Sequence, residues 1–209
     1  MADSGPWPGI HRERAALADD LADVMAWSTR SLCREWTVHD VLGHLVSIAT
    51  LTPVTFFGRL AASGFRFSAM TSRNIARETA GGPEATLARL RAHVTATTGP
   101  PGPADSWLGE VVVHGTDIRW PLGLTREFPA ETLIRVAGFY RRSNLLIGAK
   151  SRVAGLSLRA DDADWSAGSG PEVRGPMLAL VMAMTGREAA VERLSGAGVE
   201  ELAARCRTA

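Results

Sequence analysis

Cysteine is scarce in this sequence, and its scarcity argues against a secreted protein held together by disulfides. The 209 residues include two cysteines, Cys33 and Cys206. Two thiols cannot form the disulfide network that stabilises small secreted domains. The first twenty residues also lack the uninterrupted apolar core of a signal peptide. We therefore expect a cytoplasmic protein.

Long apolar runs and net charge are lacking as well. No stretch approaches the roughly 18 consecutive apolar residues that span a membrane. The 23 basic and 22 acidic residues leave a net charge of +1, which gives no reason to expect a nucleic acid or a membrane as partner. What is present is a hydrophobic content of 45% in a chain long enough to bury a sizeable core. The composition indicates a neutral globular protein.

Apolar residues recur at helical spacing through the first 148 residues. Thr37 and Asp40 have the form of a capping box, which predicts a helix start at residue 38. That helix is apolar on nearly every side, so it is expected to be buried, with a kink at Pro53. Helices are predicted over residues 10–30, 38–63, 68–79, 83–97, 107–120 and 129–146. Residues 1–148 are therefore predicted to form an antiparallel helical bundle.

The pattern changes after residue 148. Apolar and polar residues alternate over 152–160 and briefly near 164–166, which indicates strands separated by glycine-rich turns. An apolar helix is predicted over 177–186, a short strand over 189–196 and a final helix over 198–206. Residues 149–209 are therefore predicted to form a small α+β domain.

Side chains with metal-ligand chemistry lie on the predicted helix 107–120. Glu110 and His114 are four residues apart, so they share one helix face, and Asp117 follows three residues later. His44, on the apolar helix that starts at residue 38, is the best candidate for a third ligand. Three protein ligands with open positions are typical of a catalytic zinc site. A second interpretation stays open, because a histidine on an apolar helix is often a core residue and Glu-x-x-x-His pairs arise by chance.

Two segments carry a resemblance to a known family. Cys33 and Trp36 precede TVHDVLGHL, and GEVVVHGTDIRWPLG follows on the helix that holds Glu110. Both segments resemble the mycothiol-dependent maleylpyruvate isomerase family of the DinB-like metal-binding superfamily, and DDADWSAGSGPEVRGPM resembles that family's C-terminal domain. The resemblance implies a mainly α fold, with a DinB-like four-helix bundle followed by a small α+β domain. It also implies a divalent metal, commonly zinc, held by His44, Glu110 and His114.

The resemblance further implies a reaction class. Family enzymes use mycothiol or a similar thiol as cosubstrate, and a thiol that coordinates a metal is deprotonated. The predicted function is a metal- and thiol-dependent S-transferase or isomerase acting on a small electrophile. Cys-Arg-Glu-Trp stands where relatives more often have Cys-Pro-Gly-Trp. The difference lies in the loop before the helix that carries His44, so it affects the expected substrate and not the expected ligands. The alternatives are a non-enzymatic protein that binds a small molecule or lipid, and a DinB-type stress protein with a metal.

Other side chains receive narrower predictions. Asp117 could accept a hydrogen bond from His114 and orient its ring. Cys33 could be a reactive thiol near the site, but an isolated buried cysteine is usually inert. Arg73, Arg77 and Arg187 are candidates for binding a substrate carboxylate. The expected partners are a small-molecule substrate and a thiol, and the chain is expected to be a monomer or a homodimer.

Overall fold

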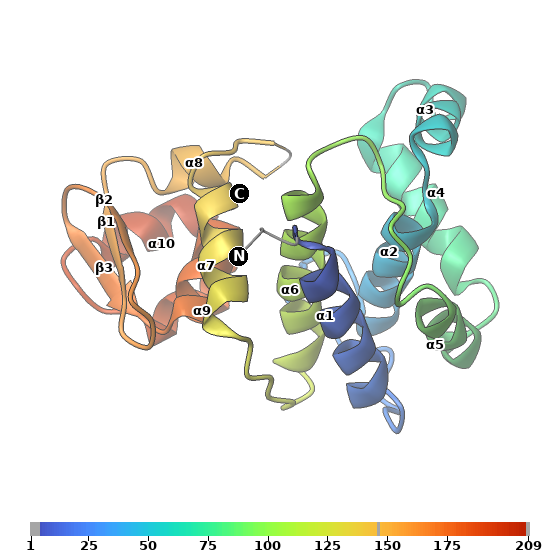
Figure 1. Ribbon diagram of the computed structural model, residues 1–209, viewed down its shortest axis with the longest axis horizontal. Helices are drawn as coiled ribbons and strands as arrows, with labels where there is room; N and C mark the ends of the chain where they lie inside the picture. Colours follow the sequence, from blue (N-terminus) through green and yellow to red (C-terminus); the bar gives the residue numbers. More distant parts are fainter. Residues whose placement is uncertain (1–4, 146, 208–209) are drawn as a thin grey trace. The chain divides into compact units, whose positions relative to one another are not determined.

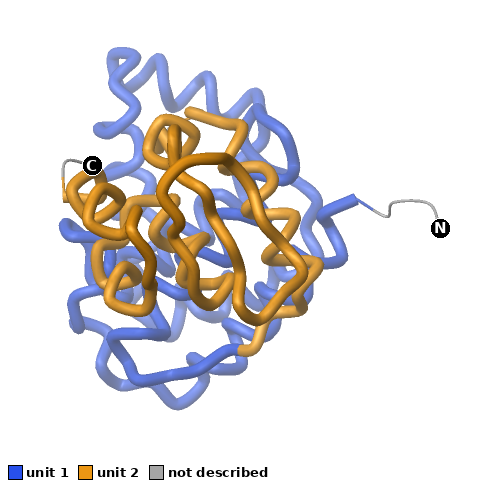
Figure 2. Tube along the Cα trace, turned by 90° about the vertical axis from the view of Figure 1, so that its left-hand side faces the viewer, with its two compact units in different colours: residues 1–126 blue, residues 127–209 orange. Residues whose placement is uncertain are grey.

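The structure, a computed structural model, describes residues 5–145 and 147–207 (Figure 1). The chain divides into two compact units, residues 1–126 and 127–209 (Figure 2). Both are mainly helical, and a small three-stranded sheet lies in the second. The predicted fold class, a helical bundle followed by a small α+β part, is confirmed. No helix in the described part of the chain is long and apolar enough to cross a membrane.

Four helices of the first unit pack into a bundle. Helices α1 (Trp7–Asp20) and α2 (Val38–Thr50) each pack against both α5 (Pro83–Ala92) and α6 (Ala104–Arg119). Apolar side chains from all four helices form one buried core, whose members include Leu17, Leu21, Val41, Leu42, Leu45, Val46, Leu87, Leu90 and Ile118. Helix α4 (Phe67–Thr79) packs on the outside of α2. The bundle therefore fixes α2 and α6, which carry the predicted ligands, side by side.

The predicted helix 38–63 is wrong in its continuity. It is two helices, because α2 ends at Thr50 and α3 (Pro53–Ala62) starts afresh. Thr52 caps α3: its Oγ1 accepts a hydrogen bond from the Thr55 amide at 3.2 Å, while Thr55 Oγ1 accepts one from the Thr52 amide at 2.9 Å. Proline fits the first turn of a helix but not its interior, so Pro53 begins a helix instead of kinking one.

Burial separates these two helices as well. Nine residues of α2 are buried, as its apolar sequence predicts. Helix α3 is equally apolar in sequence, yet none of its residues is buried. The expectation of burial was therefore right for α2 and wrong for α3.

The other helices of the first unit follow the predicted pattern with shifted bounds. Helix α1 ends at Asp20 rather than at residue 30, and α5 ends at Ala92 rather than at residue 97. Helix α4 matches the predicted 68–79 to within one residue, and α6 begins three residues before the predicted 107. Apolar spacing predicts where a helix ends less accurately than it predicts that the helix exists.

The second unit is built around a buried apolar helix. Helix α9 (Met177–Met184) packs against α7 (Ala130–Tyr140), strand β1 (Ser157–Ala160) and the 3-10 helix η1 (Glu188–Arg193). Strand β1 is central in the sheet, antiparallel to β2 (Ser166–Gly168) and parallel to β3 (Glu172–Gly175). Helices α8 (Ala149–Arg152) and α10 (Val199–Arg207) complete the unit.

Two sequence predictions fail in this unit. Residues 189–196 were expected to be a strand, but η1 covers most of them because the chain turns tightly after α9. Residues 152–156 were expected to begin a strand, but α8 and a turn occupy them. The predicted helix 129–146 ends at Tyr140, and residue 146 lies outside the described residues.

Along the chain, the boundary between the two compact units falls between residues 126 and 127, whereas the sequence predicted a domain boundary after residue 148. The difference is helix α7, which was assigned to the bundle but packs against α9. That the chain folds as two separate domains remains a prediction. Residues 1–4, 146 and 208–209, which the predicted domains include, lie outside the described part.

Candidate metal centre

A capping box fixes the start of α2 and with it the position of His44. Asp40 Oδ2 accepts hydrogen bonds from the Thr37 amide at 2.9 Å and from Thr37 Oγ1 at 2.6 Å. The Asp40 amide donates to Thr37 Oγ1 at 3.2 Å. This reciprocal pair holds the first turn in a fixed conformation. His44 lies one turn beyond Asp40, on α2, which packs against α6.

The three predicted ligands meet between α2 and α6. Glu110 Oε2 lies 3.1 Å from His44 Nε2 and 3.2 Å from His114 Nε2. One potential ligand atom of each residue lies within 4.8 Å of the others. The side chains of His44, Glu110 and His114 are 16, 21 and 12% exposed, so each is mostly buried but in part open to solvent. The structure thus brings together residues that are 70 positions apart in sequence.

Asp117 orients the His114 ring. Its Oδ2 lies 2.8 Å from His114 Nδ1, and the Asp117 side chain is fully buried. A carboxylate at this distance favours the tautomer with the proton on Nδ1, which leaves the Nε2 lone pair available to a cation. The geometry matches the predicted role of Asp117.

Cys33 contacts the same pair, so it lies near the site, as one of its two interpretations from the sequence had it. Its thiol donates to Asp117 Oδ2 at 3.1 Å, and its Sγ lies 3.6 Å from His114 Nδ1. Cys33, His114 and Asp117 form a second cluster with metal-ligand chemistry, in which His114 takes part through its other nitrogen. The signal available in the sequence was the position of Cys33 just before the capping box.

Trp36 covers the two histidine rings. Its ring centroid lies 4.9 Å from that of His44 and 5.9 Å from that of His114. The turn that presents Trp36 is braced by Ser31, whose Oγ donates to the Trp36 carbonyl at 2.8 Å. The Leu32 amide donates to the Asp117 carbonyl at 3.2 Å and ties this turn to α6. Trp36 therefore forms an apolar wall beside the three polar side chains.

Hydrogen bonding, not burial, decides the charge at this centre. Burial alone raises the pKa of Glu110, but hydrogen bonds with His114 and His44 outweigh it and hold the pKa well below its usual range. Burial lowers the pKa of His114, yet the bonds to Asp117, Cys33 and Glu110 raise it well above the usual 6.5. Without a metal, a carboxylate thus faces a protonated imidazole. A divalent cation can take the place of that proton.

The donor set fits a divalent ion. Two imidazole nitrogens converge on one carboxylate oxygen, and the second nitrogen of His114 is already hydrogen-bonded to Asp117. Histidine and carboxylate ligands with a position left open suit zinc and neighbouring transition metals. The arrangement can therefore hold an ion that also binds a small molecule.

Arg73 and Arg77 donate hydrogen bonds to residues of α3, of α4 and of the turn between them, and Arg187 donates one within the second unit. Arg73 donates to the Ala62 carbonyl at 2.8 Å and to Ser63 Oγ at 3.2 Å, at the end of α3. Arg77 donates to Asn74 Oδ1 at 3.2 Å. Arg187, in the second unit, donates to the Thr185 carbonyl at 2.9 Å. Their role in binding a substrate carboxylate remains a prediction.

Histidine and glutamate side chains that face one another inside a helical bundle are the arrangement in which such bundles can bind metals. Residues 10–101 match the family model described as the mycothiol maleylpyruvate isomerase N-terminal domain. The match falls on the family that the sequence motifs predicted, and it covers residues 10–101 of the 209. The matched region includes His44 and ends before α6, which carries Glu110 and His114.

Solved structures give the same fold. The crystal structure of the mycothiol-dependent maleylpyruvate isomerase is 16% identical, with a TM-score of 0.63, and the match covers 91% of each chain. A point mutant of that isomerase matches with a TM-score of 0.60, at the same identity and coverage. At this identity the likeness establishes the fold. A comparison with curated proteins found no match.

Proposed function

We propose that this chain is a metal-dependent enzyme that uses mycothiol or a similar thiol as cosubstrate. The reaction is an isomerisation or S-transfer on a small electrophile, with maleylpyruvate as the first substrate to test. The single observation that carries the proposal is the meeting of His44 Nε2 and His114 Nε2 at one Glu110 oxygen. The family match of residues 10–101 supports it, and so does a fold shared with a mycothiol-dependent isomerase.

His44, Glu110 and His114 would hold the ion, zinc being the first candidate. When bound, such an ion holds a thiol and deprotonates it, which supplies a nucleophile near neutral pH. Asp117 keeps the proton of His114 on Nδ1 and thereby fixes the direction of Nε2. Trp36 shields the two imidazole rings on one side. The partial exposure of the three side chains leaves room for thiol and substrate to approach.

The metal content of the purified chain tests the ligand assignment. We expect one equivalent of zinc in the wild type, and a loss of most of it in His44→Ala and in His114→Ala. His93→Ala is the matched control, because His93 contacts the Arg89 carbonyl on α5 and should retain the metal. Negligible metal in the wild type, or equal metal in wild type and His114→Ala, would contradict the proposal.

A milder substitution tests the orienting residue. Asp117→Asn keeps the shape of the side chain but removes the carboxylate that fixes the His114 tautomer. We expect zinc affinity to fall by roughly 10–100-fold, measured by competition with a chromophoric chelator. Asp23→Asn, at an exposed position after α1, is the control and should leave affinity unchanged.

Turnover of maleylpyruvate with and without mycothiol tests the reaction. The proposal predicts isomerisation that requires both the thiol and the metal and that is lost in His114→Ala. Loaded protein that turns over neither maleylpyruvate nor other small electrophiles with any thiol would favour a metal-binding stress protein. Stabilisation by lipids, with no response to metal or thiol, would favour the non-enzymatic binding protein.

A further inference from the structure

Exposed apolar side chains gather at one corner of the first unit. Val54, Phe57, Phe65 and Phe67 are 82, 58, 78 and 42% exposed, and they are four of the six large hydrophobic residues that are exposed in the described part of the chain. They belong to α3, the following turn and the first residue of α4. We call these four residues the α3–α4 apolar patch.

The patch is a cluster rather than a scatter. The half-buried Phe56 ring lies 5.4 Å from that of Phe57 and 6.4 Å from that of Phe67, between ring centroids. None of the residues of α3 is buried, although the helix is strongly apolar. Apolar surface that the fold leaves uncovered marks a site of contact with another molecule more often than a scattered hydrophobic residue does.

The backbone at Phe65 has an unusual conformation for a bulky residue. Its φ of +57° lies in the left-handed region, and in the described part of the chain Phe65 is the one non-glycine residue there. A bulky side chain is strained in that region. Because 78% of Phe65 is exposed, packing within the chain does not offset the strain. A hydrogen bond from the Phe65 amide to the Leu60 carbonyl at 2.9 Å holds this conformation at the end of α3, and it leaves the ring exposed to solvent.

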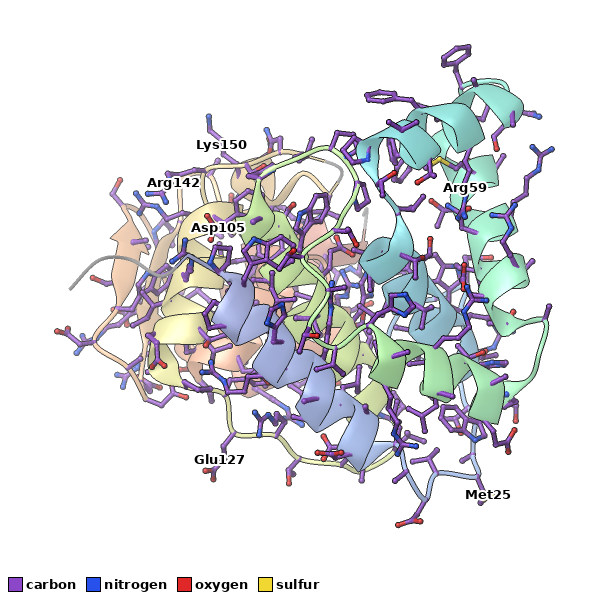
Figure 3. All side chains as sticks on the ribbon, turned by 45° about the vertical axis from the view of Figure 1, so that its right-hand side comes forward. Met25, Arg59, Asp105, Glu127, Arg142 and Lys150 are labelled. Carbon is purple, nitrogen blue, oxygen red and sulfur yellow. The ribbon has the colours of Figure 1, made fainter. Side chains whose placement is uncertain are left out.

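The charge around the patch has one sign. Residues 41–77 contain four arginines, Arg59, Arg66, Arg73 and Arg77, and no aspartate or glutamate. Arg59 and Arg77 donate to the Asn74 side chain, and Figure 3 shows Arg59 on the side of α3 toward α4. Arg73 donates to a carbonyl and a hydroxyl at the end of α3, and Arg66 is exposed.

The nearest acid in sequence does not neutralise this surface. Glu78 is buried and pairs with Arg89 of α5 at 2.7 Å. The hydrogen bonds of Arg59, Arg73 and Arg77 all go to neutral acceptors. The segment that carries the apolar rings thus holds four arginines and no acidic residue.

We propose that the α3–α4 apolar patch docks on an anionic lipid surface. The rings enter the boundary between headgroups and acyl chains, and the arginines meet the lipid phosphates. A symmetric contact with a second copy is disfavoured because it would place arginines against arginines. The whole-chain charge of +1 gave no reason to expect a membrane, because it averages this segment with acidic segments elsewhere. The docking is peripheral and independent of the metal centre.

Vesicle flotation with the full-length protein tests the docking. We expect the wild type to float with vesicles of equal parts phosphatidylcholine and phosphatidylglycerol, and not with phosphatidylcholine alone. Added salt should weaken the association, because it screens the arginines.

Two patch variants and one control make the test specific. Asparagine tolerates the left-handed backbone, so Phe65→Asn should keep or raise the melting temperature while it weakens partitioning by roughly tenfold. Arg66→Gln should weaken partitioning by about fivefold. Met25→Ser, at a site 85% exposed outside the patch, should change nothing.

Three results would overturn the docking. The first is a wild type that does not float with anionic vesicles, and the second is partitioning that Phe65→Asn and Arg66→Gln leave unchanged. The third is a wild-type dimer, by light scattering, that Phe65→Asn converts to a monomer, because the patch would then bind a second copy. A melting temperature lowered by Phe65→Asn would also count against the proposal, since the ring would then serve folding.

Discussion

Glu110 and His114 carry opposite charges in the metal-free protein, and this has a consequence for metal binding. The raised pKa of His114 keeps its imidazole protonated at pH 7, while the lowered pKa of Glu110 keeps its carboxylate ionised. A metal needs the Nε2 lone pair of His114, so the ion must displace a proton there. Glu110 has no proton to release. The raised pKa of His114 therefore contributes to the pH dependence of metal affinity.

We predict that zinc binding at pH 7 releases about one proton per ion. The affinity should rise with pH until the pH exceeds the raised pKa of His114, and then level off. Calorimetric titrations in buffers with different ionisation enthalpies count the protons. Binding at pH 7 without proton release, together with an affinity independent of pH between 6 and 8, would contradict the charge assignment.

At the scale of elements, two glycines on neighbouring helices show how differently α2 and α3 are placed. A Cβ at Gly43 of α2 would lie 2.7 Å from Thr79 Cγ2 on α4, whereas a Cβ at Gly58 of α3 would meet nothing within 4 Å. Thr79 cannot easily rotate away, because its Oγ1 donates to the Ile75 carbonyl at 2.9 Å. Gly43 allows α2 and α4 to pack closely, and Gly58 is a glycine in an open helix interior.

The two alanine substitutions should therefore change stability in opposite directions. Gly43→Ala should lower the free energy of unfolding by about 1–2 kcal/mol, as overpacking outweighs the gain in helix propensity. Gly58→Ala should raise it by roughly 0.5–1 kcal/mol. Urea denaturation of both variants measures the difference. A stabilising Gly43→Ala would show that α2 and α4 are packed more loosely than the 2.7 Å approach to Thr79 Cγ2 indicates.

Element types were largely predictable from sequence because they depend on local spacing and caps. The Thr37–Asp40 capping box and Pro83 each identified a helix start. Burial was less predictable, since α3 has the same apolar character as α2 but no neighbour that covers it. Most of the strand expected at 189–196 is instead the 3-10 helix η1. Over so few residues, the apolar spacing of a strand cannot be distinguished from that of a short helix.

At the scale of the whole molecule, the sequence predicted the bundle and the residues of the centre but not its surroundings. That His44, Glu110 and His114 come together could be predicted, because the latter two are one helical turn apart and all three stand in recognisable motifs. Their role as metal ligands stays a prediction. The contacts of Cys33 and Trp36 with the histidines depend on a turn whose path only the fold determines. Likewise, helix α7 has the pattern of a bundle helix, and only its packing against α9 assigns it to the second unit.

X-ray absorption at the zinc edge of the thiol-free, zinc-loaded protein tests the central claim most directly. The account predicts two imidazole nitrogens and carboxylate or water oxygens at about 2.0–2.2 Å, with no sulfur. His44→Ala should remove one imidazole from that shell. A sulfur scatterer at about 2.3 Å, which Cys33 would contribute, or a spectrum unchanged by His44→Ala, would contradict the assignment of His44, Glu110 and His114 as the ligands.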